Sequence, residues 1–145
     1  MSILLTFLWV ILGFASMAFW EAYIEGLYPW AGRQCGWTLR LGKKWTLTAY
    51  HFWLNIMFLF FLSLPLVIYG WDLILFGILL SALMIGLIVE DFLWYIVNPY
   101  YSLRMFNSND ANWYPWIGIG KAKIPFSYIV GIIIALLSWY FIWRI

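Results

Sequence analysis

The fold is decided by residues 46–98, TLTAYHFWLNIMFLFFLSLPLVIYGWDLILFGILLSALMIGLIVEDFLWYIVN. This stretch holds two long apolar runs, 46–69 and 72–98, which are connected through the short segment Tyr69-Gly70-Trp71-Asp72. A helix of about 20 apolar residues is long enough to cross the hydrocarbon core of a bilayer. The stretch therefore predicts two antiparallel membrane-spanning helices that are neighbours, with Asp72 as the N-cap of the second.

Two further apolar runs, 2–23 and 124–144, flank this pair. Residues 1–10 contain no Lys or Arg, so we interpret the first run as a retained helix rather than a signal peptide. The chain has 145 residues, of which 66% are hydrophobic and only 10% charged, whereas a soluble domain carries about 25% charged residues. We therefore predict an all-α, polytopic integral membrane protein with four transmembrane helices in a single domain, residues 1–145.

The composition excludes several classes of function. A net charge of +2 does not supply the basic surface that nucleic acid requires, so we expect no nucleic acid partner. The sole cysteine, Cys35, rules out an internal disulfide and a metal cage built of cysteines. The sole histidine, His51, rules out haem held by two histidines. No phosphate-binding glycine loop and no nucleophile elbow occurs in the sequence.

The distribution of Lys and Arg predicts how the helices are oriented in a cell membrane. Seven of these residues lie in the two long loops: Arg33, Arg40, Lys43, Lys44, Arg104, Lys121 and Lys123. The opposite side holds only Arg144. Because cytoplasmic loops are enriched in Lys and Arg, we expect both long loops in the cytoplasm and both termini outside.

Three rare titratable residues fall at one depth of the predicted helices. Glu21 lies 18 residues after position 3, His51 lies 18 residues before position 69, and Glu90 lies 18 residues after position 72. At about 1.5 Å per residue, each is about 27 Å from one face of a hydrocarbon core about 30 Å thick. Ionisable groups at such positions are costly and tend to be paired and functional. We predict a polar site at the cytoplasmic end of the bundle, between the first three helices.

Other polar residues near this depth receive lesser roles. Asp91 and Asn55 are secondary members of the site, and Asn55 lies one helical turn after His51, where it can orient the imidazole. Glu90 and Asp91 project about 100° apart on a helix, so we expect only one of them to point straight into the bundle. We interpret Glu25 as a solvated charge at the membrane interface.

Aromatic residues beside the predicted helices suggest a belt at the level of the lipid headgroups. Trp30 follows the first helix, and the segment Trp113-Tyr114-Pro115-Trp116 precedes the fourth. The segment either caps the cytoplasmic mouth of the bundle or anchors the loop at the interface. We favour the anchor, because Trp and Tyr are enriched at membrane interfaces.

A first interpretation of the polar site is a metal site in a membrane enzyme. Its ligands would be Glu21, His51 and Glu90, with Asp91 as a further candidate. One imidazole and two or three carboxylates suit iron, manganese or zinc with open coordination positions. The spacing of these residues matches no established metal-binding motif.

A second interpretation is acid catalysis. The segments Trp20-Glu21-Ala22-Tyr23-Ile24, with Trp30 beyond, and Glu90-Asp91-Phe92-Leu93-Trp94-Tyr95 resemble the acidic and aromatic motifs of the membrane lycopene cyclases of carotenoid synthesis. The resemblance covers these two short segments. It implies an isoprenoid or carotenoid substrate that a buried acid protonates and aromatic rings stabilise as a carbocation. Glu21, Glu90 and Asp91 are the acid or base candidates that it implies.

A third interpretation assigns no chemistry to the site and is the one that we favour from the sequence. The acids would form a network neutralised by Arg33, Arg40 or Arg104, and the protein would be a subunit of a larger membrane assembly or a homo-oligomer in the lipid bilayer. A small oligomeric transporter is a fourth possibility. If the site matters, Glu21→Gln, His51→Ala or Glu90→Gln should each impair function more than loss of Glu25.

Overall fold

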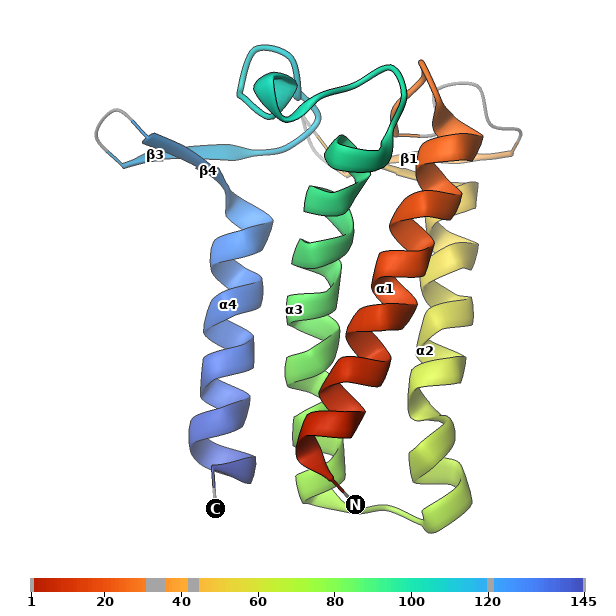
Figure 1. Ribbon diagram of the computed structural model, residues 1–145, viewed down its shortest axis with the longest axis vertical. Coiled ribbons are helices and arrows are strands. Elements are labelled where there is room, and N and C mark those ends of the chain that lie inside the picture. Colours follow the sequence, from red (N-terminus) through yellow and green to blue (C-terminus); the bar gives the residue numbers. More distant parts are fainter. Residues whose placement is uncertain (1, 31–35, 42–44, 120–121, 145) are drawn as a thin grey trace.

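Four long helices run side by side in the structure of the protein, a computed structural model that describes residues 2–30, 36–41, 45–119 and 122–144 (Figure 1). They are α1 (Ile3–Glu25), α2 (Ala49–Tyr69), α3 (Leu73–Val97) and α4 (Phe126–Ser138), which continues as a π-helical turn, Trp139–Trp143. With this turn counted as part of α4, each helix is long and apolar enough to cross a membrane. The predicted runs agree with the helix ends to within three residues.

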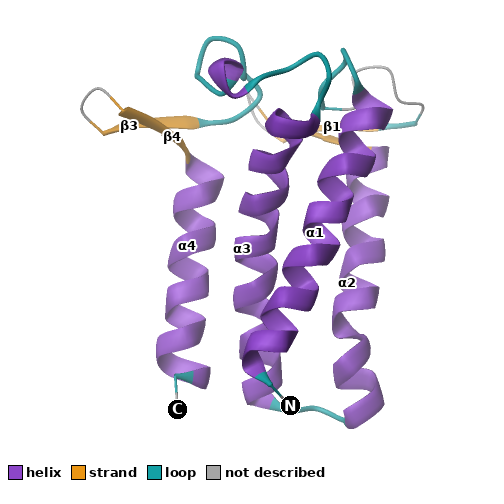
Figure 2. Ribbon diagram, in the orientation of Figure 1, coloured by secondary structure: helices purple, strands orange, loops and turns teal. Residues whose placement is uncertain are grey.

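Two short β-hairpins correct the all-α prediction (Figure 2). Strands β1 (Thr38–Leu41) and β2 (Trp45–Thr48) pair antiparallel, as do β3 (Trp116–Ile119) and β4 (Ala122–Pro125). The predicted second helix includes residues of β2, because hydropathy alone does not separate a short strand from a helical turn. The β-branched side chains of Thr46 and Thr48 favour the extended conformation instead.

Side-chain caps fix where three of the helices begin. The hydroxyl of Ser2 accepts a hydrogen bond from the Leu5 amide, and the hydroxyl of Thr48 accepts one from the His51 amide. The carboxylate of Asp72 accepts a hydrogen bond of 2.6 Å from the amide of Leu75, which confirms Asp72 as the N-cap of α3. Each cap satisfies a backbone donor that the first helical turn leaves without a partner.

The connections between the helices divide the molecule into two unlike ends. Both β-hairpins and the long connections 26–48 and 98–125 lie at one end, which we call the loop end (Figure 1). Both termini and the short α2–α3 connection lie at the other end. This arrangement has the long loops together on one side, as the distribution of Lys and Arg predicts.

Helix α3 packs closely against α1 on one side and α4 on the other because small residues line it. A Cβ atom built on Gly86 would overlap the ring of Phe14 in α1, so a side chain there would force this ring to move. On the α4 side, the Ser81 hydroxyl donates a hydrogen bond of 3.1 Å to the Ala135 carbonyl, and the Ser138 hydroxyl donates one of 2.8 Å to the Gly77 carbonyl. The small residues Gly77, Ser81 and Gly86 of α3 therefore face its neighbours.

The segment after α3 folds back over the loop end of the bundle. Asn98 holds its start, because its side-chain oxygen accepts hydrogen bonds from the amides of Tyr100 and Tyr101, and its amide nitrogen donates to the carbonyl of Gly26. A buried cluster then joins α1, α3 and this segment: Ala22, Trp94, Tyr95, Ala111 and Tyr114. The loop between α3 and α4 is thus packed onto the helices rather than spread along a membrane surface.

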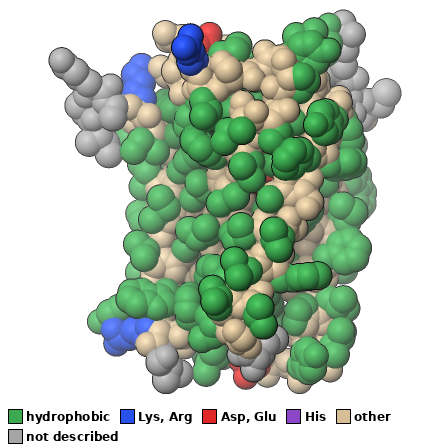
Figure 3. Space-filling view, in the orientation of Figure 1, with side chains coloured by type: hydrophobic (Ala, Val, Ile, Leu, Met, Phe, Trp, Pro, Cys, Tyr) green, Lys and Arg blue, Asp and Glu red, His purple; other side chains and the backbone are tan. Residues whose placement is uncertain are grey.

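Hydrophobic side chains cover the helical part of the surface. In the face shown in Figure 3 they occupy most of the middle, whereas the Lys and Arg side chains in view lie near the two ends. Many large apolar side chains of α1 and α2 are more than half exposed, among them Trp9, Leu12, Trp53 and Phe60. A surface of this kind matches the apolar interior of a bilayer.

Candidate functional site

Helix α1 contributes two carboxylates on one face. Glu21 and Glu25 lie one helical turn apart near the loop end, and both are buried, with 6% and 8% of their surface exposed. The burial of Glu25 shows that its interpretation as a solvated interfacial charge is wrong. The connection after α1 and the segment after α3 lie over this end of the helix, which hydropathy along the chain does not reveal.

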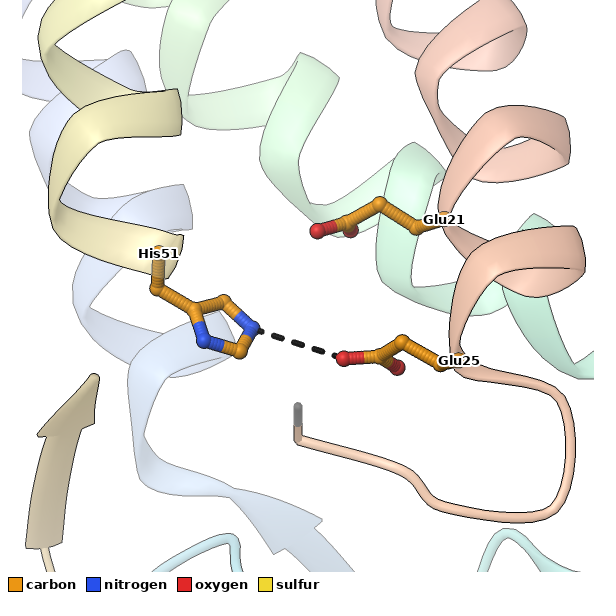
Figure 4. A group of neighbouring side chains, drawn as sticks. All are labelled: Glu21, Glu25 and His51. Carbon is orange, nitrogen blue, oxygen red and sulfur yellow. Dashed lines mark ion pairs between the residues drawn. The ribbon is translucent and has the colours of Figure 1, made fainter. Parts of the chain in front are cut away.

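Helix α2 presents the single histidine to these carboxylates. The Thr48 hydroxyl lies 2.7 Å from Nδ1 of His51, in addition to capping the helix. The other ring nitrogen, Nε2, therefore faces α1 and lies 3.8 Å from Oε1 of Glu25 (Figure 4). One atom each of Glu21, Glu25 and His51 lie within 4.8 Å of one another, and all three side chains point into the same space in Figure 4.

Trp30 holds the imidazole from the loop side. Its ring stacks on that of His51, with centroids 4.3 Å apart and planes 23° from parallel. Its indole nitrogen donates a hydrogen bond of 2.8 Å to the carbonyl of Thr46. The backbone of Trp30 has φ 59°, a left-handed conformation that a residue with a side chain adopts at a cost of about 1 kcal/mol or more. The sequence predicts Trp30 as part of an interfacial belt and of the motif that resembles lycopene cyclases, but not as a partner of His51.

Asn55 does not orient the imidazole, which corrects the prediction for it. Its side-chain amide donates a hydrogen bond of 2.7 Å to the backbone carbonyl of His51, so it stays on its own helix. Thr48 and Trp30 hold the ring instead. Thr48 lies at the start of α2 and Trp30 in the connection after α1, and helical periodicity points to neither position.

Helix α3 brings two more carboxylates to the same region. Glu90 is buried and borders the same cavity as Glu21 of α1. Two buried carboxyl groups in one small cavity are stabilised by a proton or a cation near them. On the adjoining position, Asp91 accepts a hydrogen bond of 3.0 Å from the hydroxyl of Tyr114.

All five of these titratable side chains border one cavity of about 210 Å³, which we call the polar cavity. Both Glu90 and Asp91 reach it, so the expectation that only one of them points into the bundle is wrong. The aromatic and proline side chains that close it come from three segments of the chain: Pro29, Trp30, Trp94, Trp113, Tyr114 and Pro115. The segment 113–116 thus caps the cavity, and the interpretation as a plain interfacial anchor needs this correction.

Tyr114 is a site residue that sequence analysis missed. It is almost fully buried, and this burial together with the nearby Asp91 carboxylate raises the pKa of the Tyr114 phenol well above its usual range. The hydroxyl therefore stays protonated and serves Asp91 as a hydrogen-bond donor. Its position in an aromatic, proline-containing segment was the available signal, but the same composition is typical of an interfacial anchor.

The predicted neutralising arginines do not surround the acids. Arg40 and Arg104 are exposed and form no ion pair with another described residue, and Arg33 lies outside the described residues. Within the part of the chain that the structure describes, His51 is the one basic side chain that borders the polar cavity. Among the described residues, the acids therefore border a shared cavity with His51 as their basic neighbour.

The geometry of Glu21, Glu25 and His51 is suited to a metal ion. Zinc, iron and manganese bind imidazole nitrogen and carboxylate oxygen at about 2.0–2.2 Å, so ligand atoms in such sites lie about 3–4 Å apart. The observed separations, up to 4.8 Å, are somewhat wider than this spacing, so binding requires the three side chains to move closer together. Oε1 of Glu21 is buried and has no hydrogen-bond partner among the described residues, so it is open to a cation.

Comparison with known proteins gives no relative. No protein-family model matches the chain, and neither the curated proteins nor the solved structures contain a match. The resemblance to lycopene cyclases therefore stays a prediction from two short motifs.

Proposed function

We propose that the protein is a multi-pass membrane metalloenzyme that binds one divalent transition-metal ion through Glu21, Glu25 and His51. Iron, manganese and zinc are the candidate ions, because each accepts one imidazole with two carboxylates. Glu90 lies beside Glu21 as a fourth possible ligand or a proton carrier. The convergence of three donor atoms from two helices within 4.8 Å carries the proposal.

Two further features support a catalytic rather than a structural ion. Structural zinc sites have four protein ligands, whereas catalytic sites have about three and keep a position open for water or substrate. The polar cavity of about 210 Å³ offers space for both beside the three donors. The hydrogen bond between Nδ1 of His51 and the Thr48 hydroxyl is also typical of metal-binding histidines. With Nε2 on the ion, the Nδ1–H group donates to the hydroxyl oxygen.

The proposal includes an orientation in the membrane. The loop end would lie on the cytoplasmic side, because the described parts of both long loops lie there and the two loops hold seven of the eight Lys and Arg residues of the sequence. Both termini would lie outside. The polar cavity would then sit just inside the cytoplasmic face, where water-borne metal can reach it.

Metal analysis of the detergent-purified protein tests the proposal. We expect about one ion per chain after reconstitution with zinc, manganese or, without oxygen, iron. Glu21→Gln and His51→Ala should lose it. Asn55→Ala is the matched control: Asn55 also borders the cavity, but its side-chain amide donates to a backbone carbonyl of its own helix, so this variant should retain the ion. Helical content measured by circular dichroism confirms that each variant folds. Wild-type protein that takes up far less than one of any of these ions per chain would reject the proposal.

A further inference from the structure

A second cavity adjoins the polar cavity and is of a different character. It measures about 360 Å³ and lies between α3 and α4, where apolar side chains form most of its wall: Met84, Leu87, Ile88, Phe126, Val130 and Gly131. We call it the α3–α4 groove. Gly131 lies in its wall, where a Cβ atom would make ordinary van der Waals contact with Ile88 and the backbone of Met84 at 3.4–3.6 Å.

The groove and the polar cavity share part of their walls. Leu87, Asp91, Pro115 and Ser127 border both spaces. Asp91 is the carboxylate nearest the groove, and its hydrogen bond with Tyr114 fixes one of its oxygens. A molecule in the groove can therefore place one end beside the acids of the polar cavity.

The depth of the groove indicates what fills it. From Asp91 to Met84 it follows α3 for about 10 Å toward the middle of the helix, at about 1.5 Å per residue. Both helices that form it are membrane-spanning in the proposed function, and their outer surfaces are apolar. A hydrocarbon chain is the occupant that such a space accepts from a bilayer, because polar groups there would lose their hydrogen bonds to water.

The charges beside the groove select the end group of that chain. Within the described part of the chain, four carboxylates and one imidazole border the polar cavity. A phosphate or carboxylate end group would meet like charge there. A hydroxyl group, in contrast, can donate to Asp91 and accept from the hydroxyl of Ser127, and both side chains border the groove.

We propose that the substrate is a membrane lipid with a single hydrocarbon chain and an uncharged hydroxyl end. The chain lies in the α3–α4 groove, and the hydroxyl group binds at Asp91, within reach of the metal site. That this lipid is a substrate rests on the proposed metalloenzyme function. Its binding in the groove does not, so the two can be tested apart.

Photo-crosslinking in nanodiscs tests the inference. The probe is a long-chain primary alcohol that carries a diazirine in mid-chain, and mass spectrometry maps the labelled residues. We expect label on residues 84–88 and 126–131, and we expect unlabelled long-chain alcohol to compete for it. A probe of the same chain length with a carboxylate end should label these residues at least about tenfold less, which corresponds to about 1.4 kcal/mol.

Two matched variants test where the hydrocarbon chain of the probe binds. Val130→Trp fills the groove and should lower labelling by at least about tenfold, or about 1.4 kcal/mol. Ile133→Trp adds the same side chain to α4 at a half-exposed position outside the groove, and it should leave labelling unchanged. The competition experiment uses the wild-type protein, so the test holds even if Val130→Trp does not fold.

Each outcome bears on one proposal. Label spread evenly over α1, α2 and the outer face of α4, without competition, would overturn the lipid site. Equal labelling by the carboxylate probe would overturn the choice of end group. Metal analysis of the same preparation keeps the two proposals distinct, because a protein that binds the ion but does not label in the groove loses only the lipid inference.

Discussion

Helices α3 and α2 have nearly the same length and apolar character but pack very differently. In the most apolar window of α3, 44% of the residues are buried, against 6% in that of α2. Leu54 is the one residue of α2 that is fully buried. The close packing of α3 fixes the bundle, whereas the loose packing of α2 leaves room for the polar cavity.

Side-chain size explains the difference. Glycine and serine along α3 let α1 and α4 approach until backbone and side chains touch, as Gly86 and Ser81 show. Helix α2 instead meets α1 through bulky side chains, as the rings of Phe58 and Phe14 show with centroids 4.9 Å apart, and fewer of its residues are buried. The candidate metal ligands lie on this open side, where His51 faces α1 across the cavity (Figure 4).

The largest expected effect is a loss of stability at the close contact between α1 and α3. Gly86→Leu puts a side chain where Phe14 already lies, so we expect it to destabilise the bundle by about 2–3 kcal/mol. Gly13→Leu is the matched control, because nothing lies within 4 Å of a Cβ atom at that position. It should change stability by less than about 0.5 kcal/mol. Thermal unfolding in detergent, followed by circular dichroism, measures both, and equal stability of the two variants would contradict the difference in packing.

The next largest effect is expected on metal affinity at His51 of the loosely packed helix α2. Thr48→Val removes the hydroxyl that holds Nδ1 of His51, so we expect metal affinity to fall by about 10- to 100-fold. Thr48→Ser keeps the hydroxyl and should retain most of the affinity. Titration with zinc against a competing chelator gives the two constants. If Thr48→Val and Thr48→Ser bind equally well, the hydroxyl does not position the ligand.

Much of the fold follows from the sequence because membrane helices obey local rules. Hydropathy and length give the four helices, and capping chemistry gives Asp72. The two hairpins do not follow, because a strand of four residues carries too little pattern to be separated from a loop or a helical turn. Their existence depends on pairing between segments rather than on either segment alone.

The candidate site is predictable to a smaller extent. The position of Glu21, His51 and Glu90 along the apolar runs predicts that they lie at one level. In the structure they border the same cavity. Their roles stay predictions. Glu25 and Tyr114 are missed because their burial depends on how the long connections fold over the bundle, which no local pattern records.

A smaller effect is expected from polar contacts between helices. Ser81→Ala removes the hydrogen bond to Ala135 of α4 and the one accepted from Trp143, at a cost of about 1 kcal/mol. Ser63→Ala in α2 removes only a hydrogen bond to Phe60 of the same helix and should cost less than about 0.5 kcal/mol. Thermal unfolding distinguishes them. Equal losses would mean that the contact between α3 and α4 does not depend on this serine.

The smallest expected effect is that of a substitution on the exposed face of α2. It tests whether lipid or a partner protein covers this face. Phe60 is 73% exposed, so a lipid-facing ring replaced by alanine, Phe60→Ala, should change stability by less than about 0.5 kcal/mol. Lipid chains fill the space that the ring leaves, which a protein neighbour cannot do without a cavity. If the protein is a subunit of a larger membrane assembly, Phe60→Ala should instead release a partner or lower the mass of the complex measured by light scattering. An unchanged mass and unchanged unfolding would identify the open side of the bundle as a lipid surface, and the loose packing of α2 would then serve the cavity rather than a partner.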